Sequence, residues 1–296
     1  MRLFRRSVSA PATLFLATLI CAYAQEQQQV TPPTQRAQPK EPPYLLEDGG
    51  ISIEPFYWFT TILPDRLSMK GGAASSASDA NLDFPGIIKD VPGGVLSIPA
   101  GAQSTIRISY FRLQGRGDEE LPAGATLLGS PFYAQDWLST RFILQNAKVS
   151  WDFLTWPAKP LPGKLRFKTL WEAQWVTIRT DISAPYAPAR TDSSGTSINN
   201  YPTAAKNLFL PTIGGEIEQA PSRHFRYEIK ASGFGLPHHG NIWDAEGSLG
   251  FRMKNVELLV GAKAFHYKTS PKSDEYFSQT LAGPYAGLRF YITHQE

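Results

Sequence analysis

The chain has 296 residues, of which 42% are hydrophobic and 12% aromatic, with 29 Lys and Arg against 26 Asp and Glu. Arg2, Arg5 and Arg6 precede an apolar run, and 29 minus these three leaves 26 basic residues, equal to the acidic ones. This balance argues against nucleic acid as a partner. The single cysteine, Cys21, lies in the same leading segment, so disulfide and thiolate chemistry are excluded for the remainder of the chain.

The first 24 residues have the layout of a secretory signal peptide. The three arginines are followed by an apolar run over 12–22 and by Ala22-Tyr23-Ala24, whose small residues suit a cleavage site. The run is shorter than the ~20 residues that a spanning helix needs. We therefore expect cleavage after Ala24 and export of the mature protein. Residues 25–46 are rich in Gln and Pro and predict a disordered tail on the periplasmic side.

The remainder, 47–296, is a succession of segments in which apolar and polar residues alternate. This period of two predicts strands with one apolar and one polar face. In chain order, the expected strands are 51–63, 94–99, 104–114, 137–153, 164–179, 209–219, 225–234, 241–252, 256–268 and 276–293. The alternation changes phase near Gln145, which predicts a β-bulge there.

The connections between these strands alternate in length. Long segments at 68–92, 115–136 and 181–207 are separated by short ones, as in outer-membrane barrels with short periplasmic turns and long extracellular loops. The pattern predicts an all-β fold: an antiparallel up-and-down transmembrane β-barrel of about ten strands, with eight possible. A soluble exported β-sandwich that binds a ligand remains the alternative, because the apolar faces could instead pack on a second sheet.

The last strand, Gly283–Ile292, resembles the C-terminal signal by which outer-membrane β-barrel proteins are recognised for insertion, although the final apolar residue is Ile292 instead of Phe. Asn81–Pro85, Trp243–Arg252 and Ser278–Tyr285 add to a resemblance, over most of 50–292, to a family of small bacterial outer-membrane barrel proteins that mostly lack an assigned activity. The resemblance implies the fold, an outer-membrane location and the barrel-insertion machinery as a partner. It implies no reaction.

The polar faces of the expected strands carry charges of both signs, and we expect them to form a lumen network that closes the barrel. This network comprises Arg166, Lys168, Glu172, Glu216, Glu218, Arg226, Glu228, Lys230, Asp244, Glu246 and Arg289, with Arg107, Lys148 and Lys263 as further members. Neither sign dominates, so a selectivity ring is not indicated, and a small-solute pore is the alternative.

The opposite faces are apolar and are expected to contact lipid. They carry Leu165, Phe167, Trp171, Trp175, Phe225, Tyr227, Ile229, Trp243, Leu249 and Phe251. Aromatic residues toward strand ends are expected to form girdles at the two membrane interfaces. These are Trp58, Trp137, Trp151, Trp156, Trp175, Trp243, Tyr57, Tyr267 and Tyr291.

His238 and His239 offer weak candidates for catalysis. They lie in a short connection on the side expected to be extracellular, and Asp244 follows closely, so a rim hydrolase acting on lipid or peptide is a third possibility. Solvated loop histidines are the simpler interpretation, because the sequence has no recognisable nucleophile pattern. No spacing among the five histidines indicates a zinc site, and no cofactor motif is found.

The sequence thus favours a monomeric, non-enzymatic barrel of the bacterial outer membrane with a structural or surface-interaction role. Outer-membrane lipid is an expected partner. The three long loops are the expected binding surface for an extracellular ligand, since loops on a rigid scaffold commonly carry recognition.

Overall fold

The computed structural model describes residues 50–60, 66–71, 80–83, 88–89, 91–101, 103–159, 161, 163–236, 240–270 and 275–292. The expected signal peptide and Gln/Pro-rich tail lie outside these residues, as do His238 and His239. The barrel belongs to the compact unit Pro42–Glu296. No helix in the described part of the chain is long and apolar enough to cross a membrane.

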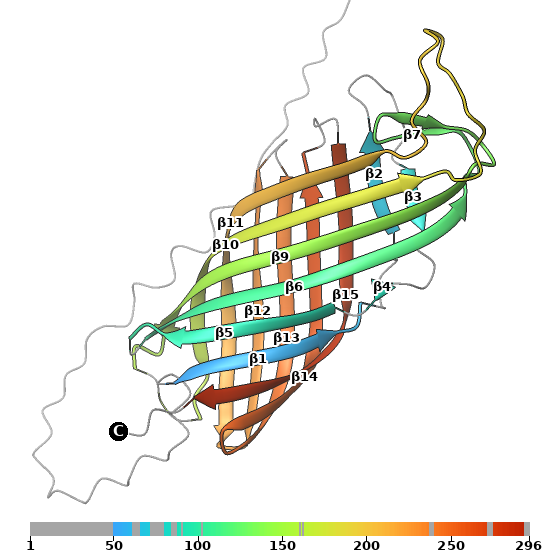
Figure 1. Ribbon diagram of the computed structural model, residues 1–296. Helices are drawn as coiled ribbons and strands as arrows, with labels where there is room; N and C mark the ends of the chain where they lie inside the picture. The colour runs from blue at the N-terminus through green and yellow to red at the C-terminus, as the bar shows by residue number, and fades with distance from the viewer. Residues whose placement is uncertain are drawn as a thin grey trace, which may run out of the picture. The chain divides into compact units, whose positions relative to one another are not determined.

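Ten antiparallel strands close into a barrel (Figure 1). They follow one another around the wall in chain order, and β1 pairs with β15 to close the circle, with Ile51 opposite Ile292 and Trp58 opposite Tyr285. The ten strands are β1 (Ile51–Trp58), β5 (Val91–Pro99), β6 (Ser104–Glu120), β9 (Trp137–Trp156), β10 (Arg166–Ser183), β11 (Thr203–Ser222), β12 (Phe225–Leu236), β13 (Gly240–Met253), β14 (Val256–Thr269) and β15 (Glu275–Ile292). The expected fold and strand number are confirmed, and the β-sandwich is not formed.

The connections after β5, β9, β11 and β13 lie at one end of the barrel, which we call the turn end. The other connections lie at the opposite end, the loop end, and the three longest are among them. The shortest turns are Arg223–His224 and Lys254–Asn255, each joining two neighbouring strands. Additional strands lie at the loop end: β2 (Arg66–Gly71) pairs with β15, β3 (Ala80–Asp83) pairs with β2, and β4 (Ile88–Lys89) pairs with β6.

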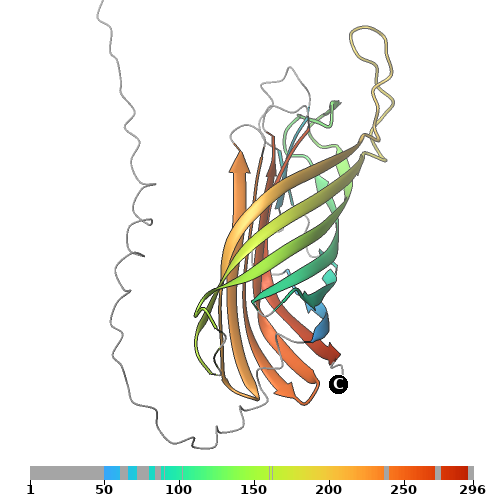
Figure 2. The same ribbon diagram turned by 90° about the vertical axis from the view of Figure 1, so that its left-hand side faces the viewer.

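Two of the three expected long loops contain more strand than the sequence indicated. Residues 68–92 hold most of β2 together with β3, β4 and the start of β5. Residues 115–136 hold the last part of β6 and a hairpin of β7 (Ala125–Leu127) and β8 (Ser130–Phe132). The third, between β10 and β11, is a loop of residues 184–202 that projects beyond the barrel (Figure 2).

The predicted bulge at Gln145 is wrong. Gln145 lies directly opposite Arg112 of β6 and Thr177 of β10, and pairing continues without a shift on both sides. The β9–β10 register instead shifts beside Phe167, near the turn end. β9 keeps its in-and-out alternation through Gln145, so the phase change is a change in residue type. Between Gln145 and the loop end the inward residues are mainly apolar, whereas toward the turn end they are polar.

This change divides the interior into two layers. Toward the turn end the inward side chains are polar or charged, whereas toward the loop end they form an apolar core. At its centre Phe111 lies edge-on to both Trp58 and Phe265, with ring centroids 5.4 Å apart in each pair. The β7–β8 hairpin adds Leu127 and Phe132 to this core. Alternating side chains from all sides thus fill the barrel.

The predicted aromatic girdle is wrong for three of its residues. Trp58, Tyr267 and Tyr291 were expected at the membrane interfaces but are buried inside the barrel. The Trp58 indole donates a hydrogen bond of 3.2 Å to the carbonyl of Gly283. A Cβ at Gly283 would lie 1.7 Å from the carbonyl oxygen of Phe59, so glycine is required for β1 and β15 to approach at the seam.

Candidate functional site

The polar layer toward the turn end, which we call the charged layer, is the largest cluster of buried ion-paired side chains among the described residues. Its basic members are Arg107, Lys148, Arg166, Lys168, Arg226, Lys230, Lys263 and Arg289. Its acidic members are Glu54, Asp152, Glu172, Glu216, Glu218, Glu228, Asp244, Glu246 and Glu257. No more than 15% of any of these side chains is exposed.

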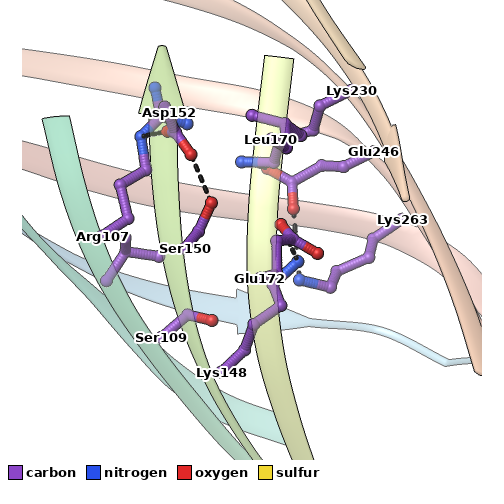
Figure 3. A pocket seen from close by; sticks show the side chains of 11 residues that line it. Arg107, Ser109, Lys148, Ser150, Asp152, Leu170, Glu172, Lys230, Glu246 and Lys263 are labelled. Atoms are coloured by element: carbon purple, nitrogen blue, oxygen red, sulfur yellow. Dashed lines mark hydrogen bonds and ion pairs between the residues drawn. The ribbon is translucent and has the colours of Figure 1, made fainter. Parts of the chain in front are cut away.

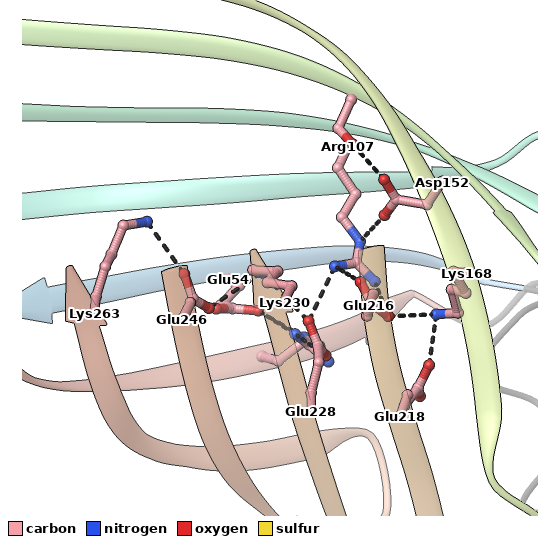
Figure 4. A network of polar contacts seen from close by, with 12 residues as sticks. Glu54, Arg107, Asp152, Lys168, Glu216, Glu218, Glu228, Lys230, Glu246 and Lys263 are labelled. Carbon is pink, nitrogen blue, oxygen red and sulfur yellow. Dashed lines mark hydrogen bonds and ion pairs between the residues drawn. The ribbon is translucent and has the colours of Figure 1, made fainter. Parts of the chain in front are cut away.

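Arg107 connects opposite walls of the barrel (Figure 4). Its Nε lies 2.8 Å from Asp152 on the neighbouring strand β9, and its Nη1 lies 3.0 Å from both Glu216 of β11 and Glu228 of β12. The guanidinium fork suits this position because it presents several donors in one plane. Arg107 thereby holds three acids, two of them across the lumen.

A second cross-lumen contact is made by Lys148 of β9. Its ammonium lies 2.9 Å from Asp244 of β13 and 3.1 Å from Glu172 of β10. Glu172 also accepts hydrogen bonds from Thr212 at 2.8 Å and from Ser232. These contacts fix β9 and β10 to the far wall, and they engage the carboxylate of Asp244 inside the barrel.

The remaining contacts run along the walls and across the seam. Lys168 binds Glu216 at 2.8 Å and Glu218 at 2.5 Å. At the seam between β1 and β15, Arg289 of β15 lies 2.6 Å from Glu54 of β1. Glu54 was not part of the predicted network.

Glu257, another acid that was missed, accepts from Arg226 at 2.9 Å and from the hydroxyl of Tyr291 at 2.5 Å. Asp152 is a third acid outside the predicted network. All three acids alternate with apolar neighbours in sequence, and this signal could have found them.

Three small cavities lie among the described residues of this layer. A cavity of about 30 Å³ lies among Arg107, Lys148, Glu172 and Lys263 (Figure 3), and two others toward the turn end measure about 30 and 10 Å³. A polar cavity of this size has room for about one or two water molecules. The ammonium of Lys263 lies 5.3 Å from the ring centroid of Phe56 and 5.6 Å from that of Phe111, so the charged layer and the apolar core are in contact.

The structure places every residue of the expected lumen network inside the barrel. The expected lipid-facing residues are on the outer wall, with fractional exposures from 39% for Phe167 to 56% for Ile229. Tyr227 is only partly exposed, as is Leu165, which precedes β10 instead of belonging to it. Among the described residues no group of three or more His, Cys, Asp or Glu is arranged to hold a metal ion.

A second polar cluster ties two connections together at the loop end. The carboxylate of Asp136, before β9, binds both terminal nitrogens of Arg190 in the β10–β11 loop, at 2.6 and 2.9 Å. The Arg190 guanidinium lies 4.3 Å from the ring centroid of Tyr133, whose backbone N–H donates to Asp136 at 2.8 Å. The hydrogen bonds from Arg190 hold the pKa of Asp136 below its ordinary value, and the bond from Tyr133 adds to this.

The Asp136–Arg190 pair, which we call the latch, predicts that the β10–β11 loop is protected from proteolysis. In Asp136→Asn, Arg190 loses its carboxylate partner, and we expect trypsin to cleave after Arg190 faster by on the order of fivefold. In the native protein the pKa of Asp136 is lowered. The stabilisation from its pair with Arg190 is therefore complete above the unfolded pKa of about 4, and it is lost as pH falls through the folded pKa. Mass spectrometry of the fragments measures the cleavage rate. Asp118→Asn, at an exposed carboxylate without an ion pair to any described residue, is the control, and equal rates in both variants would contradict the latch.

Comparison with solved structures places this architecture among outer-membrane barrels. The outer membrane protease OmpT of Escherichia coli matches with a TM-score of 0.50 at 8% identity, over 83% of this chain and 98% of OmpT. The attachment invasion locus protein Ail of Yersinia pestis gives 0.30 at 13% identity, over 81% and 99%. The toluene transporter TodX of Pseudomonas putida gives 0.34 at 8% identity, over 85% and 92%. No family model matches the sequence. The closed ten-stranded barrel and the match to OmpT together show the fold of an outer-membrane β-barrel.

Proposed function

We propose that the chain is an integral outer-membrane β-barrel with a closed lumen, acting as a structural or surface-interaction protein. One observation carries this proposal: toward the turn end, burial is inverted. The side chains of Glu216, Glu218 and Asp152 are at most 2% exposed, whereas Trp171 and Val149 on the outer wall are 53% and 50% exposed. An apolar band of this extent requires a lipid or detergent partner, because soluble monomers rarely expose such patches.

The orientation follows from the connections. We infer that the turn end is periplasmic and the loop end extracellular, which agrees with the length rule for single-chain barrels. Export through a signal peptide at 1–24, and insertion by way of the Gly283–Ile292 strand, are parts of the same proposal. The protein acts as a monomer in this scheme, since all ten strands come from one chain.

The loop end supplies the surface for interaction. In the β10–β11 loop, Tyr186 and Tyr201 are 82% and 60% exposed, and a bridge between Thr191 and Ser197 shapes the tip. Exposed tyrosines on an ordered loop favour recognition of a partner, because they offer large contact area at low entropic cost. Asp244, the acid proposed for a rim hydrolase, is bound to Lys148 inside the barrel, so it gives that alternative no support.

A closed lumen predicts electrical silence. The refolded barrel, inserted in a planar lipid bilayer, is expected to give no steady unitary conductance, because the charged layer and the apolar core succeed one another along the axis. Heat-modifiable gel mobility, together with recovery in the outer-membrane fraction, tests the membrane placement in parallel. Reproducible single-channel steps would instead establish the small-solute pore, and a chain found wholly in the periplasm would overturn the proposal.

A further inference from the structure

The outer wall of β6, β9, β10 and β11 changes character along one row of cross-strand partners. Tyr110 lies opposite Ala147, Ala147 opposite Trp175, and Trp175 opposite Phe209. The three aromatic residues of this row, which we call the girdle row, are 46%, 54% and 65% exposed. Toward the turn end the outward residues are apolar, and toward the loop end they become polar. The girdle row therefore marks the boundary between lipid tails and headgroups on this wall.

Four arginines lie on the outward face beyond the girdle row: Arg112, Arg116, Arg141 and Arg179. All four are exposed, and none forms an ion pair with another described residue. Arg116 lies directly opposite Arg141, an arrangement that is destabilising without an anion between the two charges. Asp181, opposite Arg141 on the other side, is the one acid in these rows.

An apolar groove of about 700 Å³ lies on the same wall, on the turn-end side of the girdle row. Its floor is a row of short side chains, Val149, Ala173 and Pro211, which are cross-strand partners. Trp151 and Trp171, which face each other on the next row, form its far side. The groove is apolar, as an acyl chain requires.

We propose that this wall binds one phosphate-bearing lipid of the outer leaflet, with an acyl chain in the groove and the phosphate on Arg116, Arg141 and Arg179. This site rests on the proposed membrane placement. Ala173 and Arg179 are six residues apart, roughly 20 Å along a strand tilted by about 40°, or about 15 Å of depth. The girdle row at Trp175 lies between them, so a lipid whose acyl chain occupies the groove just inside the boundary brings its phosphate past the girdle row toward the arginines. Guanidinium groups bind phosphate through paired hydrogen bonds, which explains three of them on adjacent rows.

Native mass spectrometry of the full chain in neutral detergent tests the site. The native protein is expected to bind dioleoylphosphatidic acid on the order of tenfold more tightly than dioleoylphosphatidylcholine. The variant Arg116→Gln/Arg141→Gln/Arg179→Gln is expected to bind the two lipids within about twofold of each other. Ala173→Phe, which fills the groove, is expected to weaken the binding of both lipids. The matched control Lys159→Gln/Lys164→Gln/Arg223→Gln removes the same charge at the turn end and should keep the native preference.

The outcomes separate the two proposals. A heat-modifiable barrel that inserts into vesicles but prefers phosphatidic acid no more than phosphatidylcholine overturns the lipid site alone. A chain that stays out of vesicles overturns the membrane placement as well. If millimolar inorganic phosphate displaces phosphatidic acid completely, the arginines are a simple anion site and the groove plays no part. If the turn-end control loses the preference as the arginine variant does, the attraction is general, and the site is equally overturned.

Discussion

Replacing Arg107 with Met is expected to lower the free energy of unfolding by about 3–5 kcal/mol, because one partner of a buried ionic network is removed while the others stay buried. Asp152, Glu216 and Glu228 would each lose a basic contact at 2.8 to 3.0 Å, and the cavity beside Arg107 has room for only about one or two waters. Urea unfolding of the barrel in detergent micelles, followed by tryptophan fluorescence, measures the change.

A control on the same strand isolates the network from the loss of charge. Arg112 has the same side chain but points outward, so Arg112→Met should change the unfolding free energy by only about 0.5 kcal/mol. Adding Glu216→Gln and Glu228→Gln to Arg107→Met should recover part of the stability, since fewer uncompensated charges are then buried. If Arg107→Met proved no worse than Arg112→Met, the cross-lumen contacts would not hold the barrel closed.

Phe111→Ala is expected to destabilise the barrel by about 3–5 kcal/mol through the cavity that it leaves in the apolar layer. The Phe111 ring is 2% exposed and touches Trp58, Phe265 and the ammonium of Lys263. Its loss would remove two edge-on aromatic contacts and would bring the charged layer next to an apolar void. The same urea titration measures the effect, and Phe111→Leu should retain most of the stability.

The neighbouring residue provides the comparison that decides whether the core lies inside. Tyr110 points to the outer wall and is 46% exposed, so Tyr110→Ala should cost about 1 kcal/mol. Benzene should partly restore the Phe111→Ala variant, because a dry apolar cavity binds it, and should leave Tyr110→Ala unchanged. A reversed ranking of the two variants would mean that the strand presents its other face to the interior.

Much of the wall could be read from the sequence because a strand turns successive side chains to opposite faces. In β12, Arg226 and Glu228 alternate with Phe225 and Ile229, and the structure buries the first pair and exposes the second. The same alternation, punctuated by turns such as Lys254–Asn255, was enough to give ten strands in chain order. Local pattern determines these features, so no knowledge of distant partners was needed.

The contacts across the lumen could not be read in this way. Arg107 is separated by 109 residues from Glu216 and by 121 from Glu228, and only closure of the barrel brings them together. Asp244 likewise looked available for a rim site until the fold placed it against Lys148. Pairing between distant strands depends on strand tilt and on the width of the lumen, which no local pattern records.

By itself, the sequence determined the parity of each strand, and with it which side chains share a face. It also showed that polar residues change face along β9: Lys148 and Asp152 lie on one face of the strand, whereas Arg141 lies on the other. Only the tertiary structure decided that this change of face occurs at the same row in four neighbouring strands, without a bulge. The physical reason is that a face becomes interior or exterior only when the sheet closes, and the apolar core then forms wherever the outer face is polar.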